Sequence, residues 1–254
     1  MKLPLCLPFA LAISAATLFA NNEDRFKEPF SQQGAFDRAG KITLQNINGH
    51  IEIETWDKNE ISIEGEKFAR TEEELKRIEL TIDRSESRAD IKVNLPKRIG
   101  GSGNKSIRGG VRFTLKVPAT ATLERIGSVN SSIEISGARG DVNAETVNGQ
   151  IRAQDLGGNA RLKTVNGQVL ADFSAVRPEQ ELSFDTVNGS IEITLPDDAG
   201  VRLESKVVNG HVDCDFPVEM KGRVGGKRLS GKIGDGRATL SAESVNGSIR
   251  IKKS

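Results

Sequence analysis

The chain has 254 residues, and its 36 basic and 35 acidic side chains give a formal net charge of +1 at pH 7. This balance excludes an electrostatic basis for binding nucleic acid or an anionic membrane surface. Aromatic residues make up 4% of the sequence and tyrosine is absent, whereas glycine, valine, isoleucine and threonine are frequent, which favours short strands joined by tight turns.

The first twenty residues, 1–20, read MKLPLCLPFALAISAATLFA, with one positive charge at Lys2 followed by apolar and small residues. This pattern is typical of a secretory signal peptide. Pro4 and Pro8 interrupt the apolar run, which argues against a retained membrane anchor. Cleavage would leave Cys214 as the only cysteine, so the exported chain would have no intramolecular disulfide.

The rest of the chain divides into a short leading segment and one domain. We expect residues 21–34 to form a flexible linker and residues 35–254 to form a β-repeat domain, whose regular repeats span residues 123–254. Two glycine-rich basic loops, at 97–110 and 221–237, are expected to project from this domain.

The segment from 54 to 128 is less regular than the rest. Thr71 and Glu74 fit a capping box that opens a short helix ending near Leu80. Alternating apolar residues predict strands at 61–65, 78–82, 89–95 and 111–117.

A Val-Asn-Gly motif, or a close variant of it, recurs along the chain. The asparagines of this motif are Asn48, Asn130, Asn148, Asn166, Asn188, Asn209 and Asn246. A spacing near 20 residues is a signature of repeat architectures. A valine or isoleucine precedes each asparagine, another branched aliphatic residue stands three positions after it, and the residues on both sides alternate between apolar and polar. Each repeat is therefore expected to form two short strands around one corner.

Two architectures can be built from such a unit. Asn-Gly is a strong hairpin signal, which favours an antiparallel meander or sandwich. In a hairpin, however, the valines would lie on the polar face, and Ser131 replaces glycine in one repeat, which a type I′ turn tolerates poorly. At the corner of a β-solenoid the same valines can point inward. We therefore expect an all-β fold, a β-solenoid of stacked two-strand repeats with one short helix.

The solenoid also predicts two columns of side chains that run from coil to coil. The first is a structural ladder of corner asparagines, Asn130, Asn148, Asn166, Asn188, Asn209 and Asn246. The second stands three residues before each asparagine, where Glu145, Lys163, Asp185, Lys206 and Glu243 alternate in sign. Successive coils would place these opposite charges side by side.

Several segments give the chain a family likeness. Residues 40–69, 113–124 and 231–251, together with the TVNG-type corners, resemble the bacterial DUF4097 family, whose members are described as candidate adhesins. The resemblance implies an exported, β-rich, solenoid-like protein of the cell envelope. It supplies no catalytic or binding residues.

Other motifs that suggest chemistry are incomplete. Residues 100–106, GGSGNKS, lack the glycine spacing of a phosphate-binding loop. His50 and His211 occupy the same outward slot after a corner, without partners at metal-ligand spacing. Cys214 fills a slot that isoleucine or alanine holds in other repeats, so a buried, inert core residue is expected. We expect no catalytic residue, no metal and no cofactor.

The function expected from these observations is non-enzymatic. We expect an adhesin or an interaction and structural module in the periplasm or at the cell surface, with no stable membrane insertion after cleavage. Its partner would be an envelope protein or a glycan. One alternative is a carbohydrate-active enzyme that sets Glu145, Asp185 and Lys206 on one outer face of the solenoid. A second alternative is an envelope sensor that works beside a membrane protein.

Overall fold

The computed structural model describes residues 25–95, 108–220 and 227–254. The signal peptide expected at 1–20 lies outside these residues, as does most of the basic loop expected at 97–110. Within the described part of the chain, no helix is long and apolar enough to cross a membrane.

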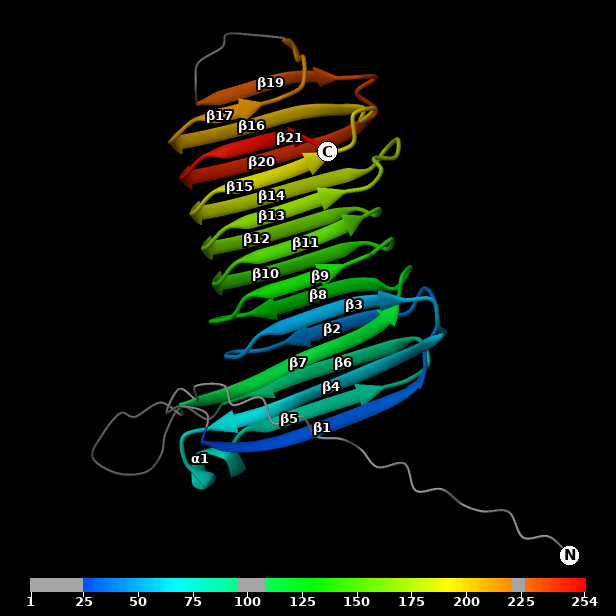
Figure 1. Ribbon diagram of the computed structural model, residues 1–254, viewed down its shortest axis with the longest axis vertical. Coiled ribbons are helices and arrows are strands. Elements are labelled where there is room, and N and C mark those ends of the chain that lie inside the picture. The colour runs from blue at the N-terminus through cyan, green and yellow to red at the C-terminus, as the bar shows by residue number, and fades with distance from the viewer. Residues whose placement is uncertain (1–24, 96–107, 221–226) are drawn as a thin grey trace, which may run out of the picture.

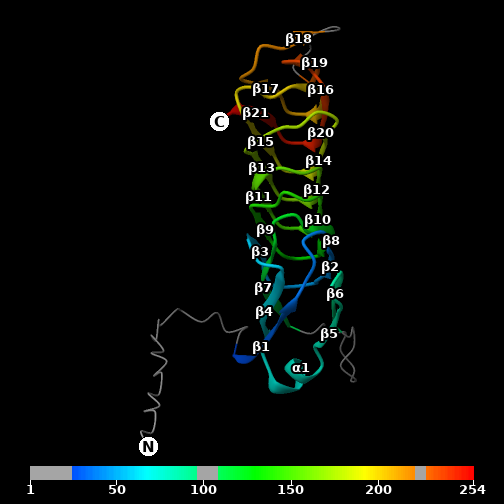
Figure 2. The ribbon, with the colours of Figure 1, turned by 90° about the vertical axis from the view of Figure 1, so that its right-hand side faces the viewer.

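The described residues form two large sheets and one short helix. In spatial order, sheet A contains β1 (Phe26–Ala35), β4 (Glu60–Ala69), β7 (Gly109–Pro118), β3 (Ile51–Trp56), β9 (Ile133–Ser136), β11 (Ile151–Leu156), β13 (Val169–Phe173), β15 (Ile191–Leu195), β21 (Ile249–Lys253) and β17 (Val212–Cys214). Sheet B contains β18 (Glu219–Met220), β19 (Arg228–Ile233), β16 (Val201–Asn209), β20 (Ala238–Asn246), β14 (Glu181–Asn188), β12 (Ala160–Asn166), β10 (Val142–Asn148), β8 (Thr122–Ser128), β2 (Lys41–Gln45), β6 (Arg88–Asn94) and β5 (Glu79–Arg84). The two sheets lie face to face, and α1 (Glu72–Lys76) lies at one end of the molecule (Figures 1 and 2).

The central part of the molecule is a solenoid. Each coil runs along a strand of sheet B, turns at a Val-Asn-Gly corner and returns along a strand of sheet A (Figure 1). Neighbouring coils pair in parallel with their corners in register, so that Asn166 of β12 lies opposite Asn148 of β10 and Asn188 of β14. Consecutive strands of a meander would pair antiparallel. The predicted β-solenoid is therefore confirmed and the meander is excluded.

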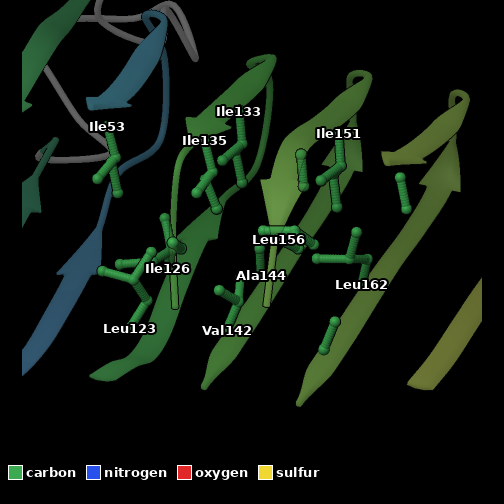
Figure 3. Close-up of a cluster of buried hydrophobic side chains, with 14 of the residues drawn as sticks. Ile53, Leu123, Ile126, Ile133, Ile135, Val142, Ala144, Ile151, Leu156 and Leu162 are labelled. Carbon is green, nitrogen blue, oxygen red and sulfur yellow. The ribbon is translucent and has the colours of Figure 1, made fainter. Parts of the chain in front are cut away.

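The core lies between the two sheets. Because successive side chains of a strand point to opposite faces, every second residue of each coil faces inward. Figure 3 shows Ile133 and Ile151 of sheet A directed toward the layer of Val142 and Leu162 from sheet B. All four side chains are buried, and each contributes about 1.5–3 kcal/mol by leaving water.

The order of the coils in space departs from their order in the chain at both ends. The last coil, β20 and β21, lies between the coil of β14 and β15 and the coil of β16 and β17. At the other end, β2 and β3 lie between β6 and β7 on one side and β8 and β9 on the other. The C-terminus therefore lies inside the stack and not at its end (Figure 1).

The expected linker at 21–34 differs from the structure. Its described part forms β1, which pairs antiparallel with β4 from Phe26 to Ala35. Phe30 packs against Phe113 with a ring-centroid distance of 5.7 Å. Only every fourth residue of β1 is shielded from solvent, so the strand lacks the alternation that marks other strands. Its polar residues and Pro29 are typical of an edge strand.

Two other local expectations are corrected in part. Helix α1 begins where the capping box predicts, because the Glu74 N–H donates to the Thr71 hydroxyl over 3.2 Å. The helix ends at Lys76 and not near Leu80, since β5 begins at Glu79. The described part of the basic loop expected at 221–237 includes β19, which pairs antiparallel with β16 instead of projecting.

Candidate functional site

The corner asparagines form a continuous column along one edge of the solenoid. The Asn166 Nδ2 donates to Asn148 Oδ1 over 2.8 Å, and Asn188 Nδ2 donates to Asn166 Oδ1 over 2.8 Å. The same pattern links, in spatial order, Asn48, Asn130, Asn148, Asn166, Asn188, Asn246 and Asn209. The structure thus brings all six predicted ladder residues together, with Asn48 as a seventh. Most of these side chains are exposed, so the ladder is a surface feature.

A column of hydroxyl residues lies beneath the corners, two positions before the asparagines. Thr146, Thr164, Thr186 and Ser244 are buried there, and each donates a hydrogen bond to a corner carbonyl of the neighbouring coil. Thr164 Oγ1, for example, donates to the Gly149 carbonyl over 3.0 Å. This column was not predicted from the sequence. The signal was the recurrent threonine two positions before Asn148, Asn166 and Asn188.

The valines before the asparagines were expected to point inward, and this expectation is wrong. Val129, Val147, Val187, Val208 and Val245 are 38–47% exposed, and Val165 in the same column is half-buried. The alternation of the strand continues into the corner, so the threonine takes the inward position and the valine the outward one. The five exposed valines are also the only large apolar side chains classed as exposed among the described residues.

A charged column runs beside these valines on the outer face of sheet B. Its order in space is Glu145, Lys163, Asp185, Glu243 and Lys206. The sign alternation that the sequence predicts is therefore interrupted, because β20 separates β14 from β16 and places Glu243 next to Asp185.

The charged column differs in its pairing from other charges on the outer faces of the two sheets. Within the described residues, none of the five side chains of the charged column makes an ion pair or a hydrogen bond. On the outer face of sheet A, by contrast, Lys252 Nζ lies 2.7 Å from Glu192 Oε1, and Lys116 Nζ lies 3.8 Å from Glu54 Oε2. The ion pairs of sheet A thus have no counterpart in the charged column among the described residues.

Two open depressions lie between the charged column and the valines. One, of about 430 Å³, is lined by Val129, Val147 and Val165 beside Glu145 and Lys163. The other, of about 320 Å³, is lined by Val187, Val208 and Val245 beside Asp185, Glu243, Lys206 and Lys163. Lys163 lines both depressions, so they are neighbours along the solenoid. We call the valine column, the charged column and these two depressions the valine face.

The remaining candidate residues lie apart from the valine face. His211 is exposed, with Nε2 3.1 Å from Asp213 Oδ2 and Nδ1 3.1 Å from Ser248 Oγ. No group of three or more metal-ligating side chains occurs in the described part of the chain. Cys214 is half-buried and not fully buried as expected, because β17 is an edge strand. Burial nevertheless raises the pKa of its thiol.

Comparison with protein families matches residues 126–252, half of the chain, to the family described as Toastrack DUF4097. No curated protein matches the sequence. Among solved structures, a candidate cell adhesion protein from Clostridium sporogenes ATCC 15579 superposes with a TM-score of 0.52 and 14% identity, over 89% of this chain and 100% of that one. A candidate adhesin from Bacteroides fragilis NCTC 9343 gives a TM-score of 0.40 and 12% identity, over 88% and 97% of the two chains. At these identities the likeness concerns the fold alone.

Proposed function

The chain belongs to the Toastrack family DUF4097, and we propose that it is an exported, non-enzymatic interaction module of the cell envelope that binds its partner along the valine face. The observation that carries this proposal is the line of exposed valines. A contiguous apolar stripe with a polar border on a soluble domain is typical of an interaction site.

The repetition of the face favours binding over catalysis. Each coil presents one valine and one neighbouring polar or charged side chain at the same position along its strand of sheet B. A partner that lies across the coils can therefore repeat the same contact on each of them. A catalytic site instead concentrates different groups around one reacting atom. A long, regular surface of this kind suits an extended partner.

The partner class proposed is an envelope protein or a surface glycan. The adhesion role in the name of the Clostridium sporogenes protein agrees with this class, while the 14% identity carries no more than the fold. The unpaired charges beside the valines add selectivity, because a partner must match their order.

The proposal is tested by immobilising the mature protein and measuring capture from envelope extracts and binding to a glycan array in parallel. Val187→Asp places a charge in the middle of the valine face, and we expect it to weaken binding at least about tenfold. The matched control is Leu170→Asp, which changes a partly exposed apolar residue on the outer face of sheet A and should leave binding unchanged.

Equal binding by the Val187→Asp variant and the parent protein would contradict the proposed face. Release of shortened oligosaccharides from the glycan array would contradict the non-enzymatic assignment.

A further inference from the structure

We infer that the partner of the valine face is a second copy of this chain, bound face to face about a two-fold axis that runs parallel to the strands over β14. This inference rests on the proposed function, since it names the partner of the same face. It follows from the order of charges on neighbouring coils.

The symmetry of such a pair determines which residues meet. A two-fold axis parallel to the strands places residues at the same position along a strand opposite each other in the two copies. The same axis reverses the order of the coils. Valine column therefore faces valine column, and charged column faces charged column in reverse order. With the axis over β14, the coil of β12 faces β20 of the other copy, and β10 faces β16.

When two charged columns face each other in opposite order, most of the facing charges have opposite sign. Lys163 on β12 faces Glu243 of the partner subunit, and Glu145 on β10 faces Lys206 of the partner subunit. Because an interface of this symmetry contains every contact twice, it has four contacts between opposite charges. Asp185 alone meets its own counterpart, close to the axis.

This complementarity depends on the inserted coil. If the coils stacked in chain order, the column would read Glu145, Lys163, Asp185, Lys206, Glu243, and the same axis would bring Glu145 onto a glutamate and Lys163 onto a lysine. The insertion of β20 between β14 and β16 exchanges the last two positions. The observed topology thus converts a self-repelling face into a self-attracting one.

The valine column supplies apolar contacts beside these charge pairs. The same axis brings Val187 onto its own counterpart and Val165 onto Val245 of the partner subunit. The five strands from β10 to β16, spaced by about 4.8 Å and seven residues long, cover roughly 550 Å² per copy. Two such faces bury roughly 1,100 Å², the size of a weak or transient interface, so we expect a weak dimer with a dissociation constant on the order of micromolar or higher.

Sedimentation of the mature protein over a range of concentrations tests the inference. Lys163→Glu sets a carboxylate against Glu243 of the partner subunit twice per dimer, and Glu243→Lys sets a lysine against Lys163 of the partner subunit twice. We expect each variant to raise the dimer dissociation constant at least about tenfold. The double variant restores both pairs and should return the constant to near its original value. Glu134→Lys, at an exposed carboxylate of sheet A, is the matched control and should have no effect.

A second variant keeps the test informative if Lys163→Glu weakens the fold. Asp185→Asn removes the one like-charge contact on the axis, and we expect it to tighten the dimer several-fold. A protein that stays monomeric up to about 1 mM, while Val187→Asp still abolishes capture of an envelope partner, would overturn the second copy as partner and leave the proposed function standing. A dimer indifferent to all of these substitutions would overturn the arrangement about β14.

Discussion

At the corners that end β10, β12 and β14, four consecutive residues have four different environments. The threonine hydroxyl is buried and donates to the neighbouring coil, the valine faces solvent, and the asparagine amide joins the surface ladder. The glycine lies directly beneath the preceding corner, where a Cβ at Gly167 would overlap the Gly149 carbonyl. The requirement for glycine at this position is one of space, because Gly167 does not have the left-handed backbone of a turn glycine.

The close approach of the corners is tested by Gly167→Ala. The added methyl group must push two coils apart, and we expect a loss of unfolding free energy of more than about 3 kcal/mol in urea denaturation. Gly127→Ala is the control, since a Cβ there would lie 3.8 Å from the nearest atom, Glu145 Cγ. That variant should be neutral or slightly stabilising, and a similar loss in both variants would contradict the spatial explanation.

The asparagine ladder is tested at Asn166, which donates to one neighbour and accepts from the other. Asn166→Ala removes both hydrogen bonds, and because the amides are exposed we expect a loss of about 1 kcal/mol. Asn166→Gly should lose as much or more, since glycine also adds backbone freedom to the unfolded chain. Chemical denaturation of both variants decides: a Gly variant as stable as the parent would mean that asparagine is chosen for backbone shape alone.

The inserted coil of β20 and β21 determines which outer side chains are neighbours on the two sheets. Strand β20 pairs in parallel with both β14 and β16, and β21 does the same with β15 and β17. The outer sheet residues of three coils consequently align as Ser183, Ser241 and Glu204. The like-charged neighbours Asp185 and Glu243 result from the same insertion.

The insertion is testable by disulfide crosslinking in a Cys214→Ala background. Cysteines introduced by Ser183→Cys and Ser241→Cys, or by Ser241→Cys and Glu204→Cys, lie on paired strands and should crosslink under mild oxidation. Ser183→Cys with Glu204→Cys should not crosslink, because strands two apart are separated by about 9–10 Å. Efficient crosslinking of Ser183→Cys with Glu204→Cys, together with no crosslinking of Ser183→Cys with Ser241→Cys, would show that the coils stack in chain order.

Some of these elements could be predicted from sequence and others could not. The corners, the parallel stack and the asparagine column follow from a local motif repeated at near-constant spacing. The order of the coils does not, because every coil carries the same corner and any two can pair in the same register. The outward direction of Val147 was missed because the inward slot was assigned to it and not to Thr146. Strand β1 was missed because only Phe26, Phe30 and Gly34 of its residues are shielded.

The ends and the outer faces of the solenoid have different roles. The terminal strands of sheet A are the polar, proline-containing β1 and the three-residue β17, and short or irregular edge strands oppose pairing between molecules. Sheet A also neutralises part of its charge internally through pairs such as Lys252 and Glu192. The valine face alone combines exposed apolar residues with charges that have no partner among the described residues.

The valine face is tested most directly by the rate of lysine acetylation. The rate is measured on the dilute protein, and again on the protein associated at high concentration or with a bound partner. Lys163 and Lys206 lie on the valine face, whereas Lys116 and Lys252 lie on the outer face of sheet A. We expect association to slow acetylation at Lys163 and Lys206 by about fivefold or more, since interface side chains lose contact with solvent, and to leave Lys116 and Lys252 unchanged. Protection of Lys116 or Lys252, with Lys163 and Lys206 still reacting at their free rates, would contradict the assignment of the valine face.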